Sequence, residues 1–279
     1  MTSYSVIVPA FNEEKAIALV VDAIRALPHS PEVIVVDDGS TDATADAARR
    51  CNATVIRHPS NAGYGKSIMD GIRMAQNDII VITDADGTYP IESIPHLIHK
   101  IEEGFEMVVG ARSGTAYRGS FLKMPARIVL KFLVEFVTGR SIPDINSGLR
   151  AFRKSTVMPY FPHLCQGFSF TTTITLIYML TAKLVTYIPI SYSRRIGRSK
   201  VRVVRDSLRT LQYVTEVVVT FNPLKFFLLL SILCSVVSVL LLLVALLYLP
   251  FVVIFSAIFL LSAILLFGIG LQTEALRRR

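Results

Sequence analysis

Cysteine is scarce in this chain of 279 residues, which contains only three. Cys51, Cys165 and Cys234 lie far apart, so no two of them have the spacing of a zinc site. A few unpaired cysteines are also typical of a protein that works in a reducing compartment. The sequence therefore argues against a zinc centre.

The glycine-rich loops that usually bind nucleotides are also missing. The segment NAGYGKS (61–67) ends like a P-loop, but that pattern needs a glycine five residues before Gly65, and Ser60 stands there. No G-x-G-x-x-G motif follows the first apolar run of the chain. These absences exclude a P-loop nucleotidase and a typical dinucleotide-binding enzyme.

Charged residues are absent from two long segments near the C-terminus, 226–249 and 250–273. Each is longer than the roughly 20 residues that a helix needs to cross the hydrocarbon core of a membrane. The mean hydropathy of the whole chain, +0.52, is also high for a purely soluble domain. Two buried core helices are the alternative, but such helices rarely stay apolar on every face. The sequence predicts a transmembrane hairpin over 224–273, which is short enough to pack against copies of itself as a homo-oligomer.

Basic residues flank this predicted hairpin on both sides. Arg202, Arg205, Arg209 and Lys225 precede it, and the basic tail 274–279 follows it. The positive-inside rule then places both ends, and the domain before them, in the cytoplasm. We also expect no signal peptide, since Met1 leads almost directly into a strand-like run.

The two signs of charge are separated along the chain. Residues 1–111 contain 8 Lys and Arg against 16 Asp and Glu, whereas residues 112–209 contain 17 against 3. The acidic part could bind a metal and the basic part an anion, and a basic region before a membrane hairpin favours lipid head groups over nucleic acid. Within 120–138 a basic residue recurs every four positions, which indicates either an interfacial helix or the solvated face of a core helix. A second amphipathic helix is predicted over 201–223.

Short apolar runs alternate with helical segments in the first part of the chain. This order predicts βαβ units and a mainly parallel sheet with both faces covered, so the fold class is α/β, with a catalytic domain over 1–200. The predicted strands are 4–11, 32–39, 53–58, 78–86 and 106–112.

Polar side chains stand at the ends of three of these strands. Asn12 and Glu13 follow the first, Asp37 and Asp38 end the second, and Asp84 and Asp86 end the fourth. Ligands of open α/β sheets bind beyond the carboxyl ends of the strands. Two carboxylates one residue apart could hold Mg²⁺ or Mn²⁺, which prefer oxygen ligands. Ordinary surface turns rich in aspartate remain the alternative.

Four motifs carry a resemblance to a known family. VIVPAFNEE (6–14), VVDDGSTD (35–42), NAGYGKS (61–67) and TDADG (83–87) together resemble the inverting family 2 glycosyltransferases of GT-A fold. DINSGLRAFRK (144–154), GFSF (167–170) and RRIGRSK (194–200) are similar to motifs of the polyprenyl-phosphate glycosyltransferases. That group includes dolichol-phosphate mannose synthase and the bacterial enzymes that glucosylate undecaprenyl phosphate. The resemblance implies a Rossmann-like GT-A domain, interfacial helices and a two-helix transmembrane hairpin.

The resemblance also implies a role for each matching residue. The expected catalytic residues are Asp84, Asp86, Asp144 and Arg127, with Asp84 and Asp86 also on the metal. The expected nucleotide-binding residues are Pro9, Ala10, Phe11, Glu13, Asp38, Asn61, Gly63, Lys66, Asp84, Ala85 and Asp86. The expected acceptor- and phosphate-binding residues are Arg112, Lys123, Arg127, Lys131, Arg195, Ser199 and Lys200.

The implied reaction is metal-dependent transfer of a sugar from a nucleotide-sugar donor to undecaprenyl or dolichyl phosphate. UDP-hexose is the expected donor and GDP-mannose the alternative. A processive polysaccharide synthase would need a Q-x-x-R-W element, which the absence of tryptophan excludes. A nucleotidyltransferase would need a glycine-rich, lysine-bearing loop near the N-terminus, and the chain has none there. A non-catalytic membrane scaffold remains the alternative of a different class.

Overall fold

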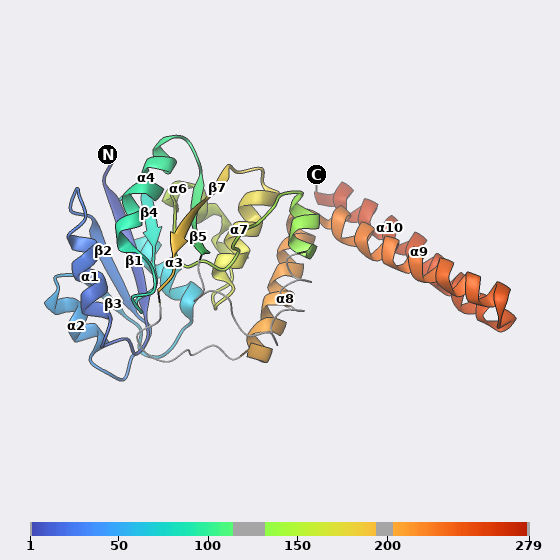
Figure 1. Cartoon of the computed structure of the whole chain (residues 1–279), viewed down its shortest axis with the longest axis horizontal. Coiled ribbons are helices and arrows are strands. Elements are labelled where there is room, and N and C mark those ends of the chain that lie inside the picture. The colour runs from blue at the N-terminus through green and yellow to red at the C-terminus, as the bar shows by residue number, and fades with distance from the viewer. Residues whose placement is uncertain (1, 114–131, 194–202, 278–279) are drawn as a thin grey trace. The chain divides into compact units, whose positions relative to one another are not determined.

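Figure 1 shows the computed structural model, which describes residues 2–113, 132–193 and 203–277. The chain separates into two compact units, Met1–Val214 and Thr215–Arg279. The strands are β1 (Tyr4–Ala10), β2 (Glu32–Asp37), β3 (Thr54–Arg57), β4 (Ile79–Ile82), β5 (Met107–Ser113), β6 (Arg150–Arg153) and β7 (Val185–Ser191). The helices are α1 (Ile17–Arg25), α2 (Thr44–Arg50), α3 (Tyr64–Met74), α4 (Ile94–Glu102), α6 (Lys154–Val157), α7 (Phe170–Leu180), α8 (Val203–Phe221), α9 (Pro223–Leu247) and α10 (Val253–Arg277).

The strands of the first unit form one sheet in the order β3-β2-β1-β4-β6-β5-β7. β1 pairs in parallel with β2 and β4, and β2 pairs in parallel with β3. β6 lies antiparallel between β4 and β5, while β7 is parallel to β5. The predicted mixed α/β class with a mainly parallel sheet is therefore confirmed.

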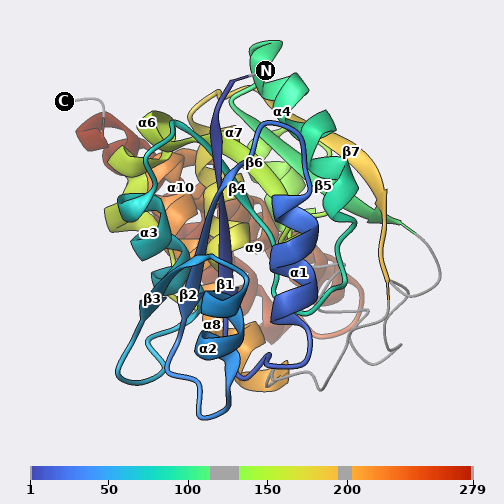
Figure 2. The same ribbon diagram turned by 90° about the vertical axis from the view of Figure 1, so that its left-hand side faces the viewer.

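Both faces of the central strands are covered, which explains why these strands read as continuous apolar runs. Val6 and Val8 of β1 belong to a core cluster that also contains the buried residues of α1 and α4. Ile7 points to the other face, where a Cβ on Gly71 of α3 would lie only 2.5 Å from its Cγ2 atom. Figure 2 shows α3 on one side of the sheet and α1 and α4 on the other.

The fourth strand is shorter than the sequence predicts. We expected it to run over 78–86, but β4 ends at Ile82 and the chain then turns. The carboxylate of Asp86 accepts a hydrogen bond from the Thr88 N–H at 3.1 Å, and Gly87 has a φ of +71°. A side-chain bond of this kind stabilises a turn, so Asp84 and Asp86 lie in the loop beyond the strand.

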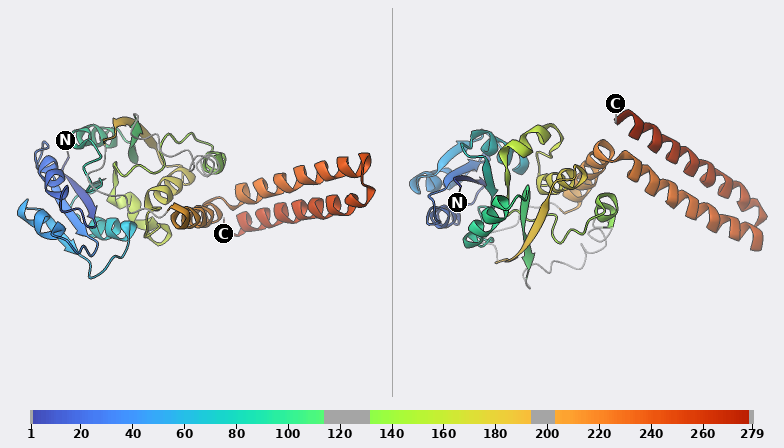
Figure 3. Two further views of the ribbon diagram at one scale, coloured as in Figure 1. Left: turned by 60° about the horizontal axis from the view of Figure 1, so that its bottom comes forward. Right: turned by 90° about the horizontal axis from the view of Figure 1, so that it is seen from above.

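The second unit contains two apolar helices, α9 and α10, that lie side by side as a hairpin (Figure 3). Both are long and apolar enough to cross a membrane. Small residues join them: Ser238 Oγ donates to the carbonyl of Ser256 at 2.8 Å, and Ser256 Oγ donates to the carbonyl of Ser238 at 2.9 Å. A Cβ on Gly270 would lie 2.8 Å from Cβ of Phe227, so the two backbones approach closely there. Such contacts are typical of helices that pack within a membrane.

Candidate active site

The loops after β1 and β2 are held together by hydrogen bonds at the carboxyl edge of the sheet. The N–H groups of Asn12 and Glu13 donate to the hydroxyls of Ser40 and Thr44, each at 2.8 Å. In return, Oδ1 of Asn12 accepts the N–H of Thr41 at 2.8 Å. The two predicted polar strand ends are thus brought together as one rigid edge.

Asp38 holds the loop that begins α3. Its carboxylate accepts the N–H groups of Ala62 at 2.8 Å and of Gly63 at 2.9 Å. Nδ1 of His58 lies 2.8 Å from the same carboxylate. Gly63 has a φ of +111°, a conformation that favours glycine. Asp38 therefore organises this loop in addition to lining the cavity described below.

The two carboxylates after β4 each accept a hydroxyl. The hydroxyl of Tyr64 donates to Oδ1 of Asp84 at 2.8 Å, and the hydroxyl of Thr88 donates to Oδ1 of Asp86 at 2.6 Å. Burial first, and then the charge of Asp84, hold the pKa of Tyr64 well above its usual value. The phenol of Tyr64 therefore stays protonated and able to donate at any physiological pH.

Asp84 and Asp86 are suited to share a divalent cation with a substrate. Among the described residues, no group of three or more His, Cys, Asp or Glu side chains could hold a metal. A pair of carboxylates nevertheless fits Mg²⁺, which commonly takes one or two from the protein and the rest of its ligands from phosphates and water. Asp86 is only 5% exposed, so its charge is poorly solvated and favours a cation nearby. The residues present therefore fit the predicted metal.

Asp144 and Arg112 form an ion pair in which the carboxylate is buried. Nε of Arg112 donates to Oδ2 of Asp144 at 2.7 Å, and Nη2 donates to Oδ1 at 2.8 Å. The guanidinium also lies over the ring of Tyr192, 5.4 Å from its centroid. Asp144 is 3% exposed and is not among the residues that line the cavity, whereas Arg112 lines it. The structure therefore connects Asp144 to the cavity through Arg112.

Arg150, which is fully buried, holds the segment that follows Asp144 in place. Its guanidinium donates to the carbonyl of Ser147 at 2.6 Å and to the carbonyl of Thr171 at 3.0 Å. Thr172, also fully buried, donates its hydroxyl to Oδ1 of Asn146 at 2.7 Å. These bonds tie the segment 144–147 to the start of α7.

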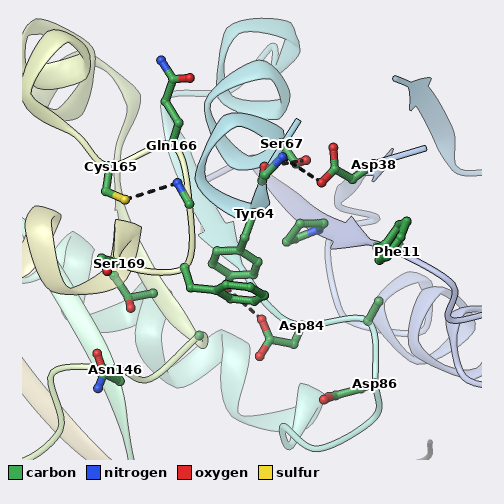
Figure 4. A pocket seen from close by; sticks show the side chains of 18 of the residues that line it. Phe11, Asp38, Tyr64, Ser67, Asp84, Asp86, Asn146, Cys165, Gln166 and Ser169 are labelled. Carbon is green, nitrogen blue, oxygen red and sulfur yellow. Dashed lines mark hydrogen bonds between the residues drawn. The ribbon is translucent and has the colours of Figure 1, made fainter. Parts of the chain in front are cut away.

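A cavity of about 1150 Å³ joins these groups within the first unit. Figure 4 shows Phe11 and Asp38 on one side and Asn146, Cys165 and Ser169 on the other. The predicted site residues that line it are Pro9, Ala10, Phe11, Glu13, Asp38, Asn61, Gly63, Asp84, Ala85, Asp86 and Arg112. Lys66 does not line the cavity, because its ammonium group is bonded to the carboxylate of Asp70. Lys123, Arg127, Lys131, Arg195, Ser199 and Lys200 lie outside the described residues.

The sequence analysis did not predict that α8 lines this cavity. The polar side chains of Arg209, Gln212 and Tyr213 line it from α8, which we expected to be a juxtamembrane helix only. Ser169 and Thr210 connect that helix to the loop before α7 through a hydroxyl–hydroxyl bond of 2.7 Å. The sequence did contain a signal for this, because residues 209, 212 and 213 are spaced i, i+3 and i+4 and therefore share one face of a helix. Other missed lining residues are Ala62, Tyr64, Ser67, Tyr89, Asn146, Gly148, Cys165, Gln166, Gly167, Phe168, Ser169, Thr171 and Tyr192.

The family model of "Glycosyl transferase family 2" matches residues 5–161 of this chain. The chain belongs to glycosyl transferase family 2. This membership confirms the family resemblance and identifies the protein as a glycosyltransferase.

Proteins of known function resemble this chain over most of its length. Undecaprenyl-phosphate 4-deoxy-4-formamido-L-arabinose transferases of Salmonella choleraesuis and Salmonella typhimurium are each 30% identical over 246 residues, which cover 84% of this chain and 72% of the relative. Among solved structures, glucosyl-3-phosphoglycerate synthase from Mycobacterium tuberculosis in complex with Mn²⁺, UDP and glucosyl-3-phosphoglycerate superposes with a TM-score of 0.62. The two chains are 21% identical, and the matched region covers 77% of this chain and 79% of the synthase chain. The same synthase with Mg²⁺ and UDP gives the same TM-score and identity. This likeness confirms the predicted GT-A fold.

Proposed function

We propose that this glycosyltransferase transfers a hexose from UDP to a polyprenyl phosphate, undecaprenyl or dolichyl phosphate, with inversion at the anomeric carbon. The observation that carries the proposal is the shared cavity of Asp84, Asp86 and Arg112. Two carboxylates that would hold a divalent cation, with a guanidinium in the same cavity, suit two polyanions that must meet. The 30% identity to undecaprenyl-phosphate sugar transferases supports the choice of acceptor.

The donor would bind at the carboxyl edge of the sheet. Phe11 offers a ring to the base, and Asp38 keeps the neighbouring loop in place. Asp84 and Asp86 would hold a divalent cation, which when bound neutralises the departing diphosphate. The Mn²⁺ and UDP in the related synthase structure support a UDP-sugar donor and a metal of this kind.

The acceptor phosphate needs little activation. Its second pKa is about 6, so it is largely ionised at neutral pH and attacks without a strong general base. Its oxygen forms a bond to the anomeric carbon on the face opposite the leaving nucleoside diphosphate, and the bond to that diphosphate breaks. Arg112 and Arg209 would bring the two phosphates together against their mutual repulsion. The protein's main task is therefore positioning.

The hairpin α9–α10 would anchor the enzyme where a polyprenyl phosphate is found, in the membrane. Lys225 lies at the start of α9 and Arg277 at the end of α10, so both ends of the hairpin carry cations. By the positive-inside rule, this charge supports a catalytic domain on the cytoplasmic face.

The test is a panel of nucleotide sugars incubated with the detergent-purified protein and short polyprenyl phosphates, with lipid products identified by mass spectrometry. A polyprenyl-phosphate hexose from a UDP-hexose is the expected product. If the only product is a mannosyl lipid formed from GDP-mannose, the donor is GDP-mannose and not a UDP-hexose. Binding without any lipid product from any donor would contradict the proposal.

A further inference from the structure

We propose that Tyr64 is a positioning residue that orients the carboxylate of Asp84 for the divalent cation, and that Phe168 keeps Tyr64 in place. The inference rests on the metal role given to Asp84 in the proposed function. It assigns a task to two residues that lie in the cavity wall between the predicted nucleotide side and the loop before α7.

The first step is the contact between Tyr64 and Asp84. The phenol donates to Oδ1 of Asp84 at 2.8 Å, and Figure 4 shows this bond at the centre of the cavity. The final torsion of an aspartate side chain has broad minima, so a carboxylate without fixed partners samples many orientations. A neutral hydroxyl that donates to one oxygen selects an orientation and leaves the negative charge in place. Metal-binding carboxylates are commonly held in this way.

The second step is the close contact of the same carboxylate with the backbone of Gly148. A Cβ placed on Gly148 would lie 2.7 Å from Oδ1 of Asp84 and 2.9 Å from Oδ2. The carboxylate therefore lies directly against the backbone of Gly148. That backbone is itself anchored, because the Gly148 N–H donates to the hydroxyl of Tyr89 at 2.6 Å. Asp84 thus contacts an anchored backbone as well as the Tyr64 hydroxyl.

The third step is the position of Tyr64 itself. It is the first residue of α3, and the helix start is packed tightly against the loop 165–168. The Lys66 N–H donates to the carbonyl of Gln166 at 2.8 Å, and a Cβ on Gly65 would lie 2.1 Å from the carbonyl oxygen of Cys165. The ring of Phe168 stacks on the ring of Tyr64 with centroids 6.1 Å apart and planes 15° apart. The loop before α7 therefore holds the ring of Tyr64 in place, and the hydroxyl of that ring in turn holds Asp84.

The test measures Mn²⁺ binding to the full chain in detergent with saturating UDP, by the electron paramagnetic resonance signal of free Mn²⁺. Tyr64→Phe removes only the hydroxyl and should weaken Mn²⁺ binding by about tenfold or more, the usual effect of losing such a partner. The matched control is Tyr178→Phe, because the buried Tyr178 hydroxyl has no hydrogen-bond partner within the described part of the chain. The control should bind Mn²⁺ as the wild type does. Both variants should unfold at similar temperatures without metal.

A second comparison tests the role of Phe168. Phe168 is 52% exposed, so Phe168→Ala should leave the fold intact. This change should weaken Mn²⁺ binding several-fold in the wild type but less than twofold in the Tyr64→Phe background, because its effect passes through Tyr64. Equal weakening in both backgrounds would show that Phe168 does not act through Tyr64.

The outcomes separate this inference from the proposed function. If the wild type binds Mn²⁺ with UDP and Tyr64→Phe binds it equally or more tightly, the positioning role is overturned and the proposed function stands. A lower unfolding temperature with unchanged Mn²⁺ affinity would show a structural role only, and it too would overturn the inference. If the wild type itself binds no Mn²⁺ with UDP, the metal role of Asp84 fails and the inference fails with it.

Discussion

Arg112 and Asp144 meet through two parallel hydrogen bonds, of 2.7 and 2.8 Å, between a guanidinium and a buried carboxylate. The side chain of Asp144 is 2% exposed and that of Arg112 is 15% exposed. Such a fork-to-fork arrangement fixes the plane of the guanidinium as well as its position. Arg112 is therefore presented to the cavity by a residue that does not line it.

Asp144→Asn should reduce sugar transfer by at least tenfold, because Arg112 loses its charged partner and its fixed orientation. Removing one member of a buried pair typically costs about 3–5 kcal/mol of unfolding free energy, and we expect the lower end because asparagine still accepts one hydrogen bond. The control is Asp46→Asn, which breaks an exposed pair with Arg49 and should cost less than about 1 kcal/mol. Thermal unfolding and transfer assays on both variants provide the comparison. Full activity of Asp144→Asn would show that Arg112 needs no partner.

Gly148→Ala should impair transfer strongly while leaving the fold intact. The new Cβ would come within 2.9 Å of both oxygens of Asp84, so the carboxylate must move. Overpacking of this kind typically costs about 1–3 kcal/mol. Transfer rates and Mn²⁺ affinity should both fall in this variant. A variant with normal Mn²⁺ affinity would mean that Asp84 is not confined by Gly148.

Asp86→Asn should lower the transfer rate by about two orders of magnitude, the usual size of a lost electrostatic contribution to catalysis. The amide keeps the shape of the side chain and an oxygen that can accept from Thr88, but it removes the negative charge. Removal of metal by EDTA should have a comparable effect on the wild type and little further effect on the variant. Asp46→Asn again serves as the control. Wild-type rates that are equal in EDTA and in Mn²⁺ would contradict the metal role.

Deletion of residues 224–279 should leave a protein that still binds UDP. The first compact unit ends at Val214, and the cavity is formed within it. Calorimetric titration with UDP should give an affinity close to that of the full chain, while transfer to membrane-embedded polyprenyl phosphate should fall. A folded truncated protein that cannot bind UDP would place part of the site in the hairpin.

Gly270→Ala should destabilise the hairpin and Gly268→Ala should not. An added Cβ at 270 would lie 2.8 Å from Cβ of Phe227, whereas no atom of the described residues lies within 4 Å of one at 268. The first change therefore separates two packed helices, and the second gains up to about 1 kcal/mol of helix propensity. Thermal unfolding in detergent should show a lower midpoint for Gly270→Ala alone. Equal midpoints would mean that the two helices do not pack closely at Gly270.

The sequence alone determined the features that depend on local pattern. Apolar runs such as Ile79–Ile82 become buried strands because only the interior of a sheet can cover both of their faces. Carboxylates directly after such runs must lie at the sheet's carboxyl edge, which is why Asp84 and Asp86 could be predicted. The two apolar helices followed from length and lack of charge in the same way.

The tertiary structure alone decided which residues meet across the fold. Hydrophobic periodicity reports whether a side chain is buried, but not which distant residue it contacts. Tyr64 and Asp84 are 20 residues apart, and Arg112 and Asp144 are 32 apart, so neither contact could be read from spacing. The antiparallel insertion of β6 between β4 and β5 likewise depends on long-range pairing. Asp144 was predicted from its motif, but its role as the partner of Arg112 exists only because the folded chain brings the two side chains together and buries the carboxylate.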